Sequence, residues 1–310
     1  MSLKTNYHEP AVNVLAHHGK SFRFAGRFLD KRQLEDCARL YRFCRFIDDM
    51  VDEATVVAAA RKELDHLKHD LEIGNSTDPA IQDFIKLASQ YEMQSRVVME
   101  LIKGIESDLH PVQIMTEAEL LRYCYRVAGT VGLLMCDVLR VYDLRARAHA
   151  IDLGIAMQLT NIARDVREDA ELGRCYIPSQ WLGELEPKLL AKPCPLRSLW
   201  IKESVKRILA LADRYYKSGS VGIRFLPLKA QLGIRIAGLI YKEIGLVLAE
   251  RDYDVYGPRA YVSLPRKILV AFKAAFFKTN RQAYLPHDTD LHIHLSGLPY
   301  AHDASQKKSP

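Results

Sequence analysis

Apolar side chains recur every three or four residues along most of the chain, and short polar turns separate the segments that show this spacing. This spacing is typical of amphipathic helices, because an α-helix turns once in about 3.6 residues. We therefore predict an all-α protein built as a bundle of long helices. The predicted helices cover residues 31–53, 55–72, 80–108, 117–141, 146–170, 197–218, 228–254 and a last stretch that ends near residue 279.

A proline-rich, charged loop at residues 184–195 interrupts this pattern. We do not interpret it as a domain boundary, because neither flank carries a complete set of candidate site residues. One domain is predicted over residues 1–280. Residues 281–310 are rich in proline, histidine and serine with little apolar periodicity, so we expect a flexible tail. His292 and His294 resemble a metal-binding pair, but without partner ligands we interpret them as incidental.

The helix predicted over residues 146–170 carries an acidic row. Asn161, Asp165 and Asp169 recur every fourth residue, and four residues advance an α-helix by slightly more than one turn. Their side-chain oxygens therefore share one face of the helix. Hard cations such as Mg²⁺ and Mn²⁺ prefer carboxylate and amide oxygens. A solvated acidic surface would show the same spacing, so this row alone leaves both interpretations open.

A second acidic row lies on the helix predicted over residues 31–53. Asp48 and Asp52 are four residues apart, and Tyr41 and Arg45 continue the same face upstream. The helix is too apolar to be a surface element, and carboxylates inside an apolar bundle need partners because burying an uncompensated charge is very costly. Arg45 could pair with either aspartate of the row or bind a diphosphate through two hydrogen bonds.

Two such rows can face each other across the mouth of a helical bundle and hold a metal-bridged diphosphate. Ionising an allylic diphosphate requires neutralisation of the departing pyrophosphate, and carboxylate-bound Mg²⁺ provides this as a Lewis acid. Arginine, lysine and tyrosine donors would add to the stabilisation. The apolar helices would form a cavity that keeps water from a carbocation. Gly129 and Gly132 would admit either a closely packed helix or a long ligand.

The amino-acid composition does little to identify the ligand. The chain has 310 residues and a net charge of +6, with a pI of about 8.9. Excess positive charge suits nucleic acid, anionic lipid and phosphorylated ligands alike. Six cysteines occur without a CxxC pair, and the N-terminus lacks an apolar signal core. We therefore expect reduced cysteines in a cytoplasmic protein.

The last predicted helix has the composition of a membrane-surface helix. Its basic and aromatic residues are Lys267, Lys273, Lys278, Phe272, Phe276 and Phe277. No apolar run reaches the roughly 18–20 residues that a spanning helix needs. The helix could therefore lie against the inner face of the membrane as a peripheral contact, or it could simply pack on the core.

Five segments carry a resemblance to a known family. HGKSF, YRFCRFIDDMVDE, YCYRVAGTVG, MQLTNIARDVREDAELGRCYIP and RAYVSLPRK resemble, in order, the motifs of squalene/phytoene synthases across roughly residues 15–280. The resemblance implies an all-α isoprenoid-synthase fold with a central apolar cavity. It also implies Mg²⁺-dependent, head-to-head condensation of two prenyl diphosphates, with Mn²⁺ as an alternative ion. The NIARDVRED segment is most similar to bacterial phytoene synthases, which implies that two geranylgeranyl diphosphates yield phytoene through prephytoene diphosphate.

Carried over by position, the resemblance implies three groups of site residues. The metal-binding positions are Asp48, Asp52, Asn161, Asp165 and Asp169. The positions that bind diphosphate or substrate are His18, Lys20, Ser21, Tyr41, Arg45, Gln158, Arg164 and Arg266. Tyr125 and Tyr241 correspond to cavity tyrosines that would orient pyrophosphate or handle a proton. The implied catalytic set comprises the four aspartates, Tyr41, Arg45 and both cavity tyrosines.

Two residues depart from the family's pattern. Arg126 stands where a small residue, often glycine, is usual, which leaves the shape of the cavity wall beside it open. Arg167 adds a cation between two metal-binding positions. It is rotated by roughly 160–200° from the face that carries Asp165 and Asp169, so we expect it to point outward.

Other functions remain as alternatives. Two farnesyl diphosphates would instead give dehydrosqualene, presqualene diphosphate or squalene, and the depth of the cavity would separate these products. Squalene formation requires NADPH, which we do not expect this protein to use. A catalytically silent relative could act as an assembly protein, although both acidic rows are complete. A di-iron bundle would need Glu-x-x-His pairs, which the helices that carry the two acidic rows lack. We expect a monomer or weak dimer with no nucleic acid partner.

Overall fold

The computed structural model describes residues 7, 9–54, 56–183, 186–276 and 286–301. Within these ranges the chain is helical, with no strand and a single isolated bridge between Gln113 and Cys175, which confirms the predicted all-α class. The α-helices are α1 Ala11–His18, α2 Lys20–Gly26, α3 Lys31–Asp52, α4 Val57–Ile73, α5 Pro79–Gln90, α6 Ser95–Glu106, α7 Glu117–Cys124, α8 Thr130–Val138, α9 Arg145–Arg164, α10 Val166–Glu171, α11 Ser179–Leu182, α12 Pro187–Ala191, α13 Pro195–Gly222, α14 Leu228–Glu250 and α15 Leu264–Phe276.

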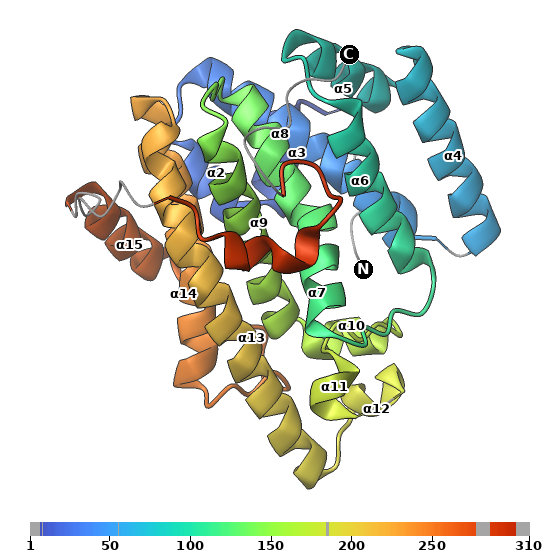
Figure 1. The fold of residues 1–310 in the computed structure, drawn as a ribbon, viewed down its shortest axis with the longest axis vertical. Helices are drawn as coiled ribbons and strands as arrows, with labels where there is room; N and C mark the ends of the chain where they lie inside the picture. The colour runs from blue at the N-terminus through green and yellow to red at the C-terminus, as the bar shows by residue number, and fades with distance from the viewer. Residues whose placement is uncertain (1–6, 8, 55, 184–185, 277–285, 302–310) are drawn as a thin grey trace.

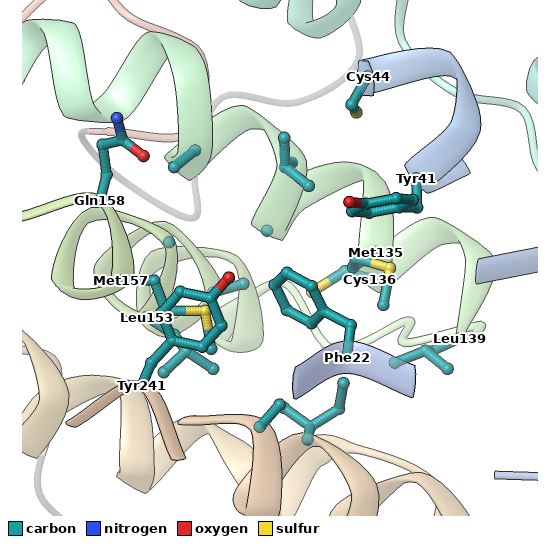
Figure 2. Close-up of a pocket in the computed structure, with 18 of the residues that line it drawn as sticks. Phe22, Tyr41, Cys44, Met135, Cys136, Leu139, Leu153, Met157, Gln158 and Tyr241 are labelled. Carbon is teal, nitrogen blue, oxygen red and sulfur yellow. The ribbon is translucent and has the colours of Figure 1, made fainter. Parts of the chain in front are cut away.

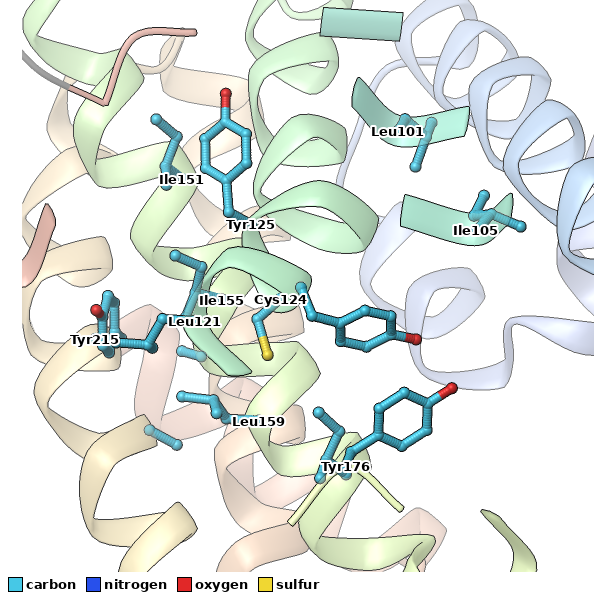
Figure 3. Close-up of a cluster of buried hydrophobic side chains, with 14 of the residues drawn as sticks. Leu101, Ile105, Leu121, Cys124, Tyr125, Ile151, Ile155, Leu159, Tyr176 and Tyr215 are labelled. Atoms are coloured by element: carbon cyan, nitrogen blue, oxygen red, sulfur yellow. The ribbon is translucent and has the colours of Figure 1, made fainter. Parts of the chain in front are cut away.

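Helix α9 runs through the middle of the bundle, between α8 on one side and α13 and α14 on the other (Figure 1). Its side chains are buried around most of its circumference, including Ile151, Ile155, Ala156 and Leu159. A helix that is apolar all round belongs in a core and not on a surface. Buried residues on both sides of the loop at 184–195 belong to one hydrophobic cluster, part of which is drawn in Figure 3.

The predicted helix over residues 117–141 is observed as α7, one π-helical turn η2 (Tyr125–Gly129) and α8, in direct succession. Glycines let this wall approach α9 closely. A Cβ atom added to Gly132 would lie 2.2 Å from the carbonyl oxygen of Ala150, and one added to Gly154 would lie 2.3 Å from that of Ala128. Contacts this short would force the backbones apart, so close helix packing explains Gly132.

The predicted helix over residues 146–170 is interrupted at the acidic row. Helix α9 ends at Arg164, Asp165 has a φ of −102° and a ψ of 16°, and α10 begins at Val166. The amide of Asp169 still donates to the carbonyl of Asp165 at 2.8 Å. The turn therefore continues through the break, and Asp165 and Asp169 stay on one side of the chain.

The expectation of a loose tail is wrong for residues 286–301. This segment contains the 3₁₀ turn η4 (Thr289–Leu295) and buries Leu291 and Leu295 against the bundle. The hydroxyl of Tyr215 donates to the carbonyl of Leu291 at 2.6 Å, and both tyrosines that hold this segment, Tyr215 and Tyr125, are drawn in Figure 3. Local apolar periodicity did not predict this packing, because the tyrosines that hold the segment lie 76 and 174 positions upstream of the carbonyls that they bind. Residues 281–285 and 302–310 lie outside the described residues.

The fold shows no membrane-spanning element in its described part, because no helix there combines the necessary length with the necessary hydrophobicity.

Candidate active site

The structure brings the two predicted acidic rows to one polar pocket of about 300 Å³. Asp48 and Asp52 enter it from the last turns of α3, and Asn161, Asp165 and Asp169 enter it from the junction of α9 and α10. Each row thus includes the C-terminal end of a helix, because Asp52 ends α3 and Asn161 lies in the last turn of α9. The helix macrodipole makes such ends negative, so it adds to the charge of the carboxylates instead of offsetting it.

An apolar cavity of about 390 Å³ continues from this polar pocket into the bundle (Figure 2). Arg45, Asp48, Gln158 and Asn161 line both spaces, so they mark the junction. Beyond the junction the walls come mainly from α3, η2, α8, α9 and α14. The arrangement offers a charged head site that opens directly into a long apolar channel.

Burial and mutual repulsion perturb the carboxylates of the polar pocket. Burial, together with the negative charge of Asp52, raises the pKa of Asp48 to about 8. Burial and the charge of Asp165 likewise raise the pKa of Asp169 to about 8. Burial raises the pKa of Asp108 to about 6, although two tyrosine hydroxyls donate to it. The protein's own cations therefore do not fully compensate the negative charge here.

Arginines compensate part of this charge. Burial opposes the ionisation of Asp165, but hydrogen bonds from Arg164 and Arg259 outweigh it and lower its pKa. Arg259 binds Asp165 through Nε and Nη2, at 2.9 and 2.8 Å. Arg174 donates from Nη1 to Oδ1 of Asp52 at 2.7 Å. Planar, two-point pairing of this kind is the geometry that arginine also uses for phosphate.

The donor set of the pocket fits a hard divalent cation. Oδ1 of Asn161 is buried, and no donor among the described residues hydrogen-bonds to it. Its Nδ2 donates to Oε1 of Gln158 at 3.2 Å, so the amide is oriented while its oxygen stays available. A buried oxygen without a donor, next to carboxylates with raised pKa values, is an arrangement that a Mg²⁺ or Mn²⁺ ion would satisfy.

The model of the squalene/phytoene synthase family matches residues 15–266 of this chain. The chain belongs to this family. It is 32% identical over 288 residues to a 15-cis-phytoene synthase of Enterobacter agglomerans, covering 88% of this chain and 97% of the relative. It is 36% identical over 266 residues to a phytoene synthase of Rhodobacter capsulatus, covering 84% of this chain and 78% of the relative.

Solved structures of the family share the fold. A dehydrosqualene synthase superposes with a TM-score of 0.75 at 24% identity, covering 86% of this chain and 94% of the other. A squalene synthase of Alicyclobacillus acidocaldarius gives a TM-score of 0.66 at 19% identity, covering 79% and 95%. These likenesses establish the isoprenoid-synthase helical fold for this member of the family.

Several other predicted residues of this squalene/phytoene synthase family member lie around the apolar cavity. His18, Tyr41 and Tyr241 line it together with Phe22. The ring of Phe22 lies 6.1 Å from that of Tyr41 and 5.2 Å from that of Tyr241, centroid to centroid. Figure 2 shows the three rings converging on one part of the cavity. Burial raises the pKa of both tyrosines above the usual range, so they are neutral hydroxyl donors.

The N-terminal basic residues are only partly at the site. Lys20 and Ser21 begin α2 after Gly19, but they line neither the polar pocket nor the apolar cavity. Burial and the nearby charge of Lys20 lower the pKa of Lys267, which places these two cations close together. Diphosphate binding by Lys20 and Ser21 remains a prediction.

Two positions carried over from the family are not at the cavity in this chain. Tyr125, expected to line it, points away from it into the core, and its hydroxyl donates to the carbonyl of Pro299 at 2.5 Å. Arg266, expected to bind diphosphate, pairs with Glu243 and Glu250 of α14 and lines neither the cavity nor the polar pocket. Tyr125 begins a π-helical turn, which changes the direction of its side chain. Arg266 is held away from the cavity by its ion pairs with Glu243 and Glu250.

The other three arginines that the sequence analysis discussed each pair with a carboxylate. Arg126 donates to Glu100 at 2.9 Å and lies outside the cavity lining, so it does not alter the cavity wall. Arg167 pairs with Glu171 on the surface, as predicted. Arg45 forms its ion pair with Asp49, which lies between the two aspartates of the row, and not with Asp48 or Asp52.

The sequence analysis did not assign five polar residues that line the polar pocket, namely Asp108, Tyr123, Arg174, Tyr176 and Arg259. Tyr123 and Tyr176 both donate to the carboxylate of Asp108, at 2.8 and 2.9 Å. Arg174 and Arg259 lie inside the segments GRCYIP and RAYVSLPRK, which resemble motifs of the family. The resemblance therefore included these two arginines but assigned them no role.

The position of Tyr125 generates a prediction. Tyr125→Phe should lower the free energy of unfolding by about 1 kcal/mol, because the carbonyl of Pro299 loses its buried donor. It should leave turnover in a prenyl diphosphate assay essentially unchanged. Urea unfolding and steady-state kinetics measure the two effects. Tyr215→Phe is the matched control, since it also removes one buried hydrogen bond to residues 286–301. A large loss of kcat at unchanged stability in Tyr125→Phe alone would contradict this orientation.

Proposed function

We propose that this protein is a phytoene synthase. It joins two geranylgeranyl diphosphates head to head, through prephytoene diphosphate, to give phytoene and two pyrophosphates. The observation that carries this proposal is the direct opening of the acidic pocket into the long apolar cavity at Asp48 and Asn161. A diphosphate head and a prenyl tail require this combination. The names of the curated relatives support the choice of product.

The acidic rows would hold the metal. Asp48, Asp52, Asn161, Asp165 and Asp169 supply oxygen donors from three helix ends. When bound, Mg²⁺ supplies the Lewis acidity that neutralises the departing pyrophosphate. The chain's own residues then bind and orient the phosphate oxygens, and the four arginines that line the pocket are suited to this role, namely Arg45, Arg164, Arg174 and Arg259.

The reacting carbons would lie beside the rings of Phe22, Tyr41 and Tyr241. These rings face the cavity near its junction with the acidic pocket, where an allylic cation forms when pyrophosphate leaves (Figure 2). An aromatic face stabilises a nearby cation through its quadrupole, and the apolar wall excludes water that would trap it. The proton lost in forming phytoene would pass to the released pyrophosphate, for which the hydroxyl of Tyr41 or Tyr241 is a donor.

The length of the cavity supports a geranylgeranyl donor. Its lining follows α9 from Asn161 to Ala146, and these 15 residues of helix span about 22 Å. A geranylgeranyl chain has about 16 carbons in line and extends to roughly 19 Å, whereas a farnesyl chain extends to roughly 14 Å. Leu139, Ile223 and Leu226 join Ala146 in lining the deep part of the cavity. Dehydrosqualene or squalene synthesis from farnesyl diphosphate is the alternative that this length disfavours.

The acidic rows generate a second prediction. Asp48→Asn or Asp165→Asn should lower kcat/KM by about 100-fold or more, because each removes a charged oxygen from the ion and diphosphate site. Circular dichroism should show an intact helical fold. Glu53→Gln is the matched control, because Glu53 is exposed one residue beyond the α3 row and lines neither space. Full activity in either aspartate variant would disprove the two-row site.

The far end of the cavity generates a third prediction. Purified protein with Mg²⁺ should convert geranylgeranyl diphosphate to phytoene without NADPH, as identified by mass spectrometry. Ala146→Leu should fill the deep end and shift the kcat/KM ratio of geranylgeranyl to farnesyl diphosphate by at least about 10-fold toward farnesyl. The ratio compares two donors on one variant, so partial misfolding does not change it. A C30 hydrocarbon as the main wild-type product would favour the farnesyl alternative.

Helix α15 supports contact with a membrane surface. Leu264, Ile268, Phe272 and Phe276 recur every fourth residue and are 56 to 69% exposed. Val270 and Ala274 on the other side are buried, and α15 packs against α14. An exposed apolar stripe flanked by lysines lies readily at the interface of an anionic bilayer. Prenyl donors and a hydrocarbon product both partition into lipid, so such contact would shorten their path.

This surface generates a fourth prediction. Wild-type protein should sediment with vesicles that contain anionic lipid, and the double variant Ile268→Asp, Phe272→Asp should lose this binding by about 10-fold or more, since each charge opposes insertion of the stripe. Ile73→Asp is the matched control, because Ile73 is equally exposed, at 56%, but lies on α4. Equal sedimentation of all three proteins would rule out α15 as the contact.

A further inference from the structure

A second group of chemically active side chains lies at the cavity's deep half, where the C-terminal segment crosses the bundle (Figure 1). His149 and Asp152 belong to α9, Ser218 belongs to α13, and His287 and His292 belong to the C-terminal segment. The side chain of Asp152 is fully buried, and its ion pairs in the described part of the chain are with histidines alone. The proposed reaction uses none of these groups as a phosphate or metal ligand.

Hydrogen bonds orient this cluster. Nε2 of His287 lies 2.7 Å from Oδ2 of Asp152, and Nε2 of His292 lies 2.8 Å from Oδ1. The hydroxyl of Ser218 donates to Oδ2, and the same hydroxyl lies 3.0 Å from Nδ1 of His149. The Ser218 hydroxyl has one proton and gives it to the carboxylate, so Nδ1 of His149 donates to the Ser218 oxygen.

The tautomer of His292 is fixed in the same way. Its Nδ1 lies 2.9 Å from the carbonyl oxygen of Ala301, which can only accept. Its Nε2 lies 2.8 Å from Oδ1 of Asp152. Nδ1 of His149 is likewise held by the oxygen of Ser218. Metal-binding histidines are oriented by such outer hydrogen bonds.

The geometry points to a zinc-type metal site formed by His149, Asp152 and His287. One donor atom from each residue lies within 4.8 Å of the other two. In a tetrahedral zinc site with ligands at about 2.0–2.1 Å, the donor atoms are roughly 3.3 Å apart. A contraction of at most about 1.5 Å is therefore needed, and because Nε2 of His287 already lies 2.7 Å from Asp152, it falls on the distances to His149. The fourth position would be taken by water.

The donor types separate this site from the acidic pocket. Two imidazoles and one carboxylate suit Zn²⁺ and similar transition metals, whereas the oxygen-only rows suit Mg²⁺ or Mn²⁺. The two sites are also separated in space, because Asp152 precedes Asn161 by nine residues, or about 13 Å, along α9. When a neutral His287 binds the ion through Nε2, its proton moves to Nδ1, so the ion replaces a hydrogen bond between His287 and Asp152 with two coordinate bonds.

The consequence of such an ion is a fixed C-terminal segment. It would tie His287 to α9 and place a positive charge beside a fully buried aspartate, which otherwise depends on histidines for compensation. His149 also lines the apolar cavity, so the ion would fix one residue of the cavity wall. The site is therefore structural and does not take part in the prenyl transfer.

The test uses the full chain, equilibrated with micromolar Zn²⁺, desalted and measured by elemental analysis. Wild-type protein should retain about one zinc per chain. His287→Gln should retain none, although glutamine can still donate to Asp152. His294→Gln, in the same segment but exposed, should retain zinc like the wild type. Co²⁺ in place of Zn²⁺ should give the visible absorption of a tetrahedral nitrogen and oxygen site in the wild type and in His294→Gln only.

Two further measurements keep the outcome clear. A chelator should lower the melting temperature of the wild type and leave that of His287→Gln unchanged, which separates a metal from a hydrogen-bond effect. Asp48→Asn should retain zinc, so a failure of the proposed enzyme function is distinguishable from a failure of this site. Equal zinc contents of wild type and His287→Gln would overturn the proposal, as would loss of zinc in Asp48→Asn.

Discussion

The arrangement of this protein depends on the cost of burying negative charge in an apolar bundle. Burial raises the pKa values of Asp48, Asp108 and Asp169, and the negative charge of a neighbouring carboxylate of the rows adds to the rise in each case. Carboxylates in such surroundings are stable only with partners. The partners come from distant parts of the chain, because Arg174 follows α10 and Arg259 follows α14. The acidic pocket therefore draws together the ends of several helices, and the apolar cavity lies behind the point where they meet.

Helix α9 connects the charged and apolar parts of the site. Its C-terminal turn carries Asn161 to the acidic pocket, and its N-terminal half lines the deep cavity down to Ala146. Gly154 on this helix, together with Gly132 on α8, permits backbone contact that no larger residue would allow. This close packing limits movement of α9, so the distance between the reacting head and the end of the tail is fixed by the backbone. Under the proposed function, chain length and bond formation would therefore be decided at different positions of this one helix.

The sequence alone predicted the parts that depend on local spacing. The helices and both acidic rows follow from periodicity, because residues four apart share a face in any α-helix. The partners of those rows did not follow, because Arg259 reaches Asp165 across 94 positions and no local pattern encodes that contact. Tyr125 illustrates a different limit, since one π-helical turn rotates it away from the expected wall. Residues 286–301 illustrate a third, because hydrogen bonds from Tyr125 and Tyr215 hold a segment that has little periodicity of its own.

The arginines of the acidic pocket explain how the site can exist before a substrate arrives. Arg164 and Arg259 keep Asp165 ionised by occupying both of its oxygens. A guanidinium binds phosphate with the same planar geometry, so an incoming diphosphate offers these side chains an equivalent acceptor. Transfer of an arginine from the carboxylate to the phosphate would free an oxygen of Asp165 for a cation at the moment when the diphosphate brings more negative charge. The negative charge that is costly to bury in this pocket is thus the charge that would favour binding of a metal and a diphosphate together.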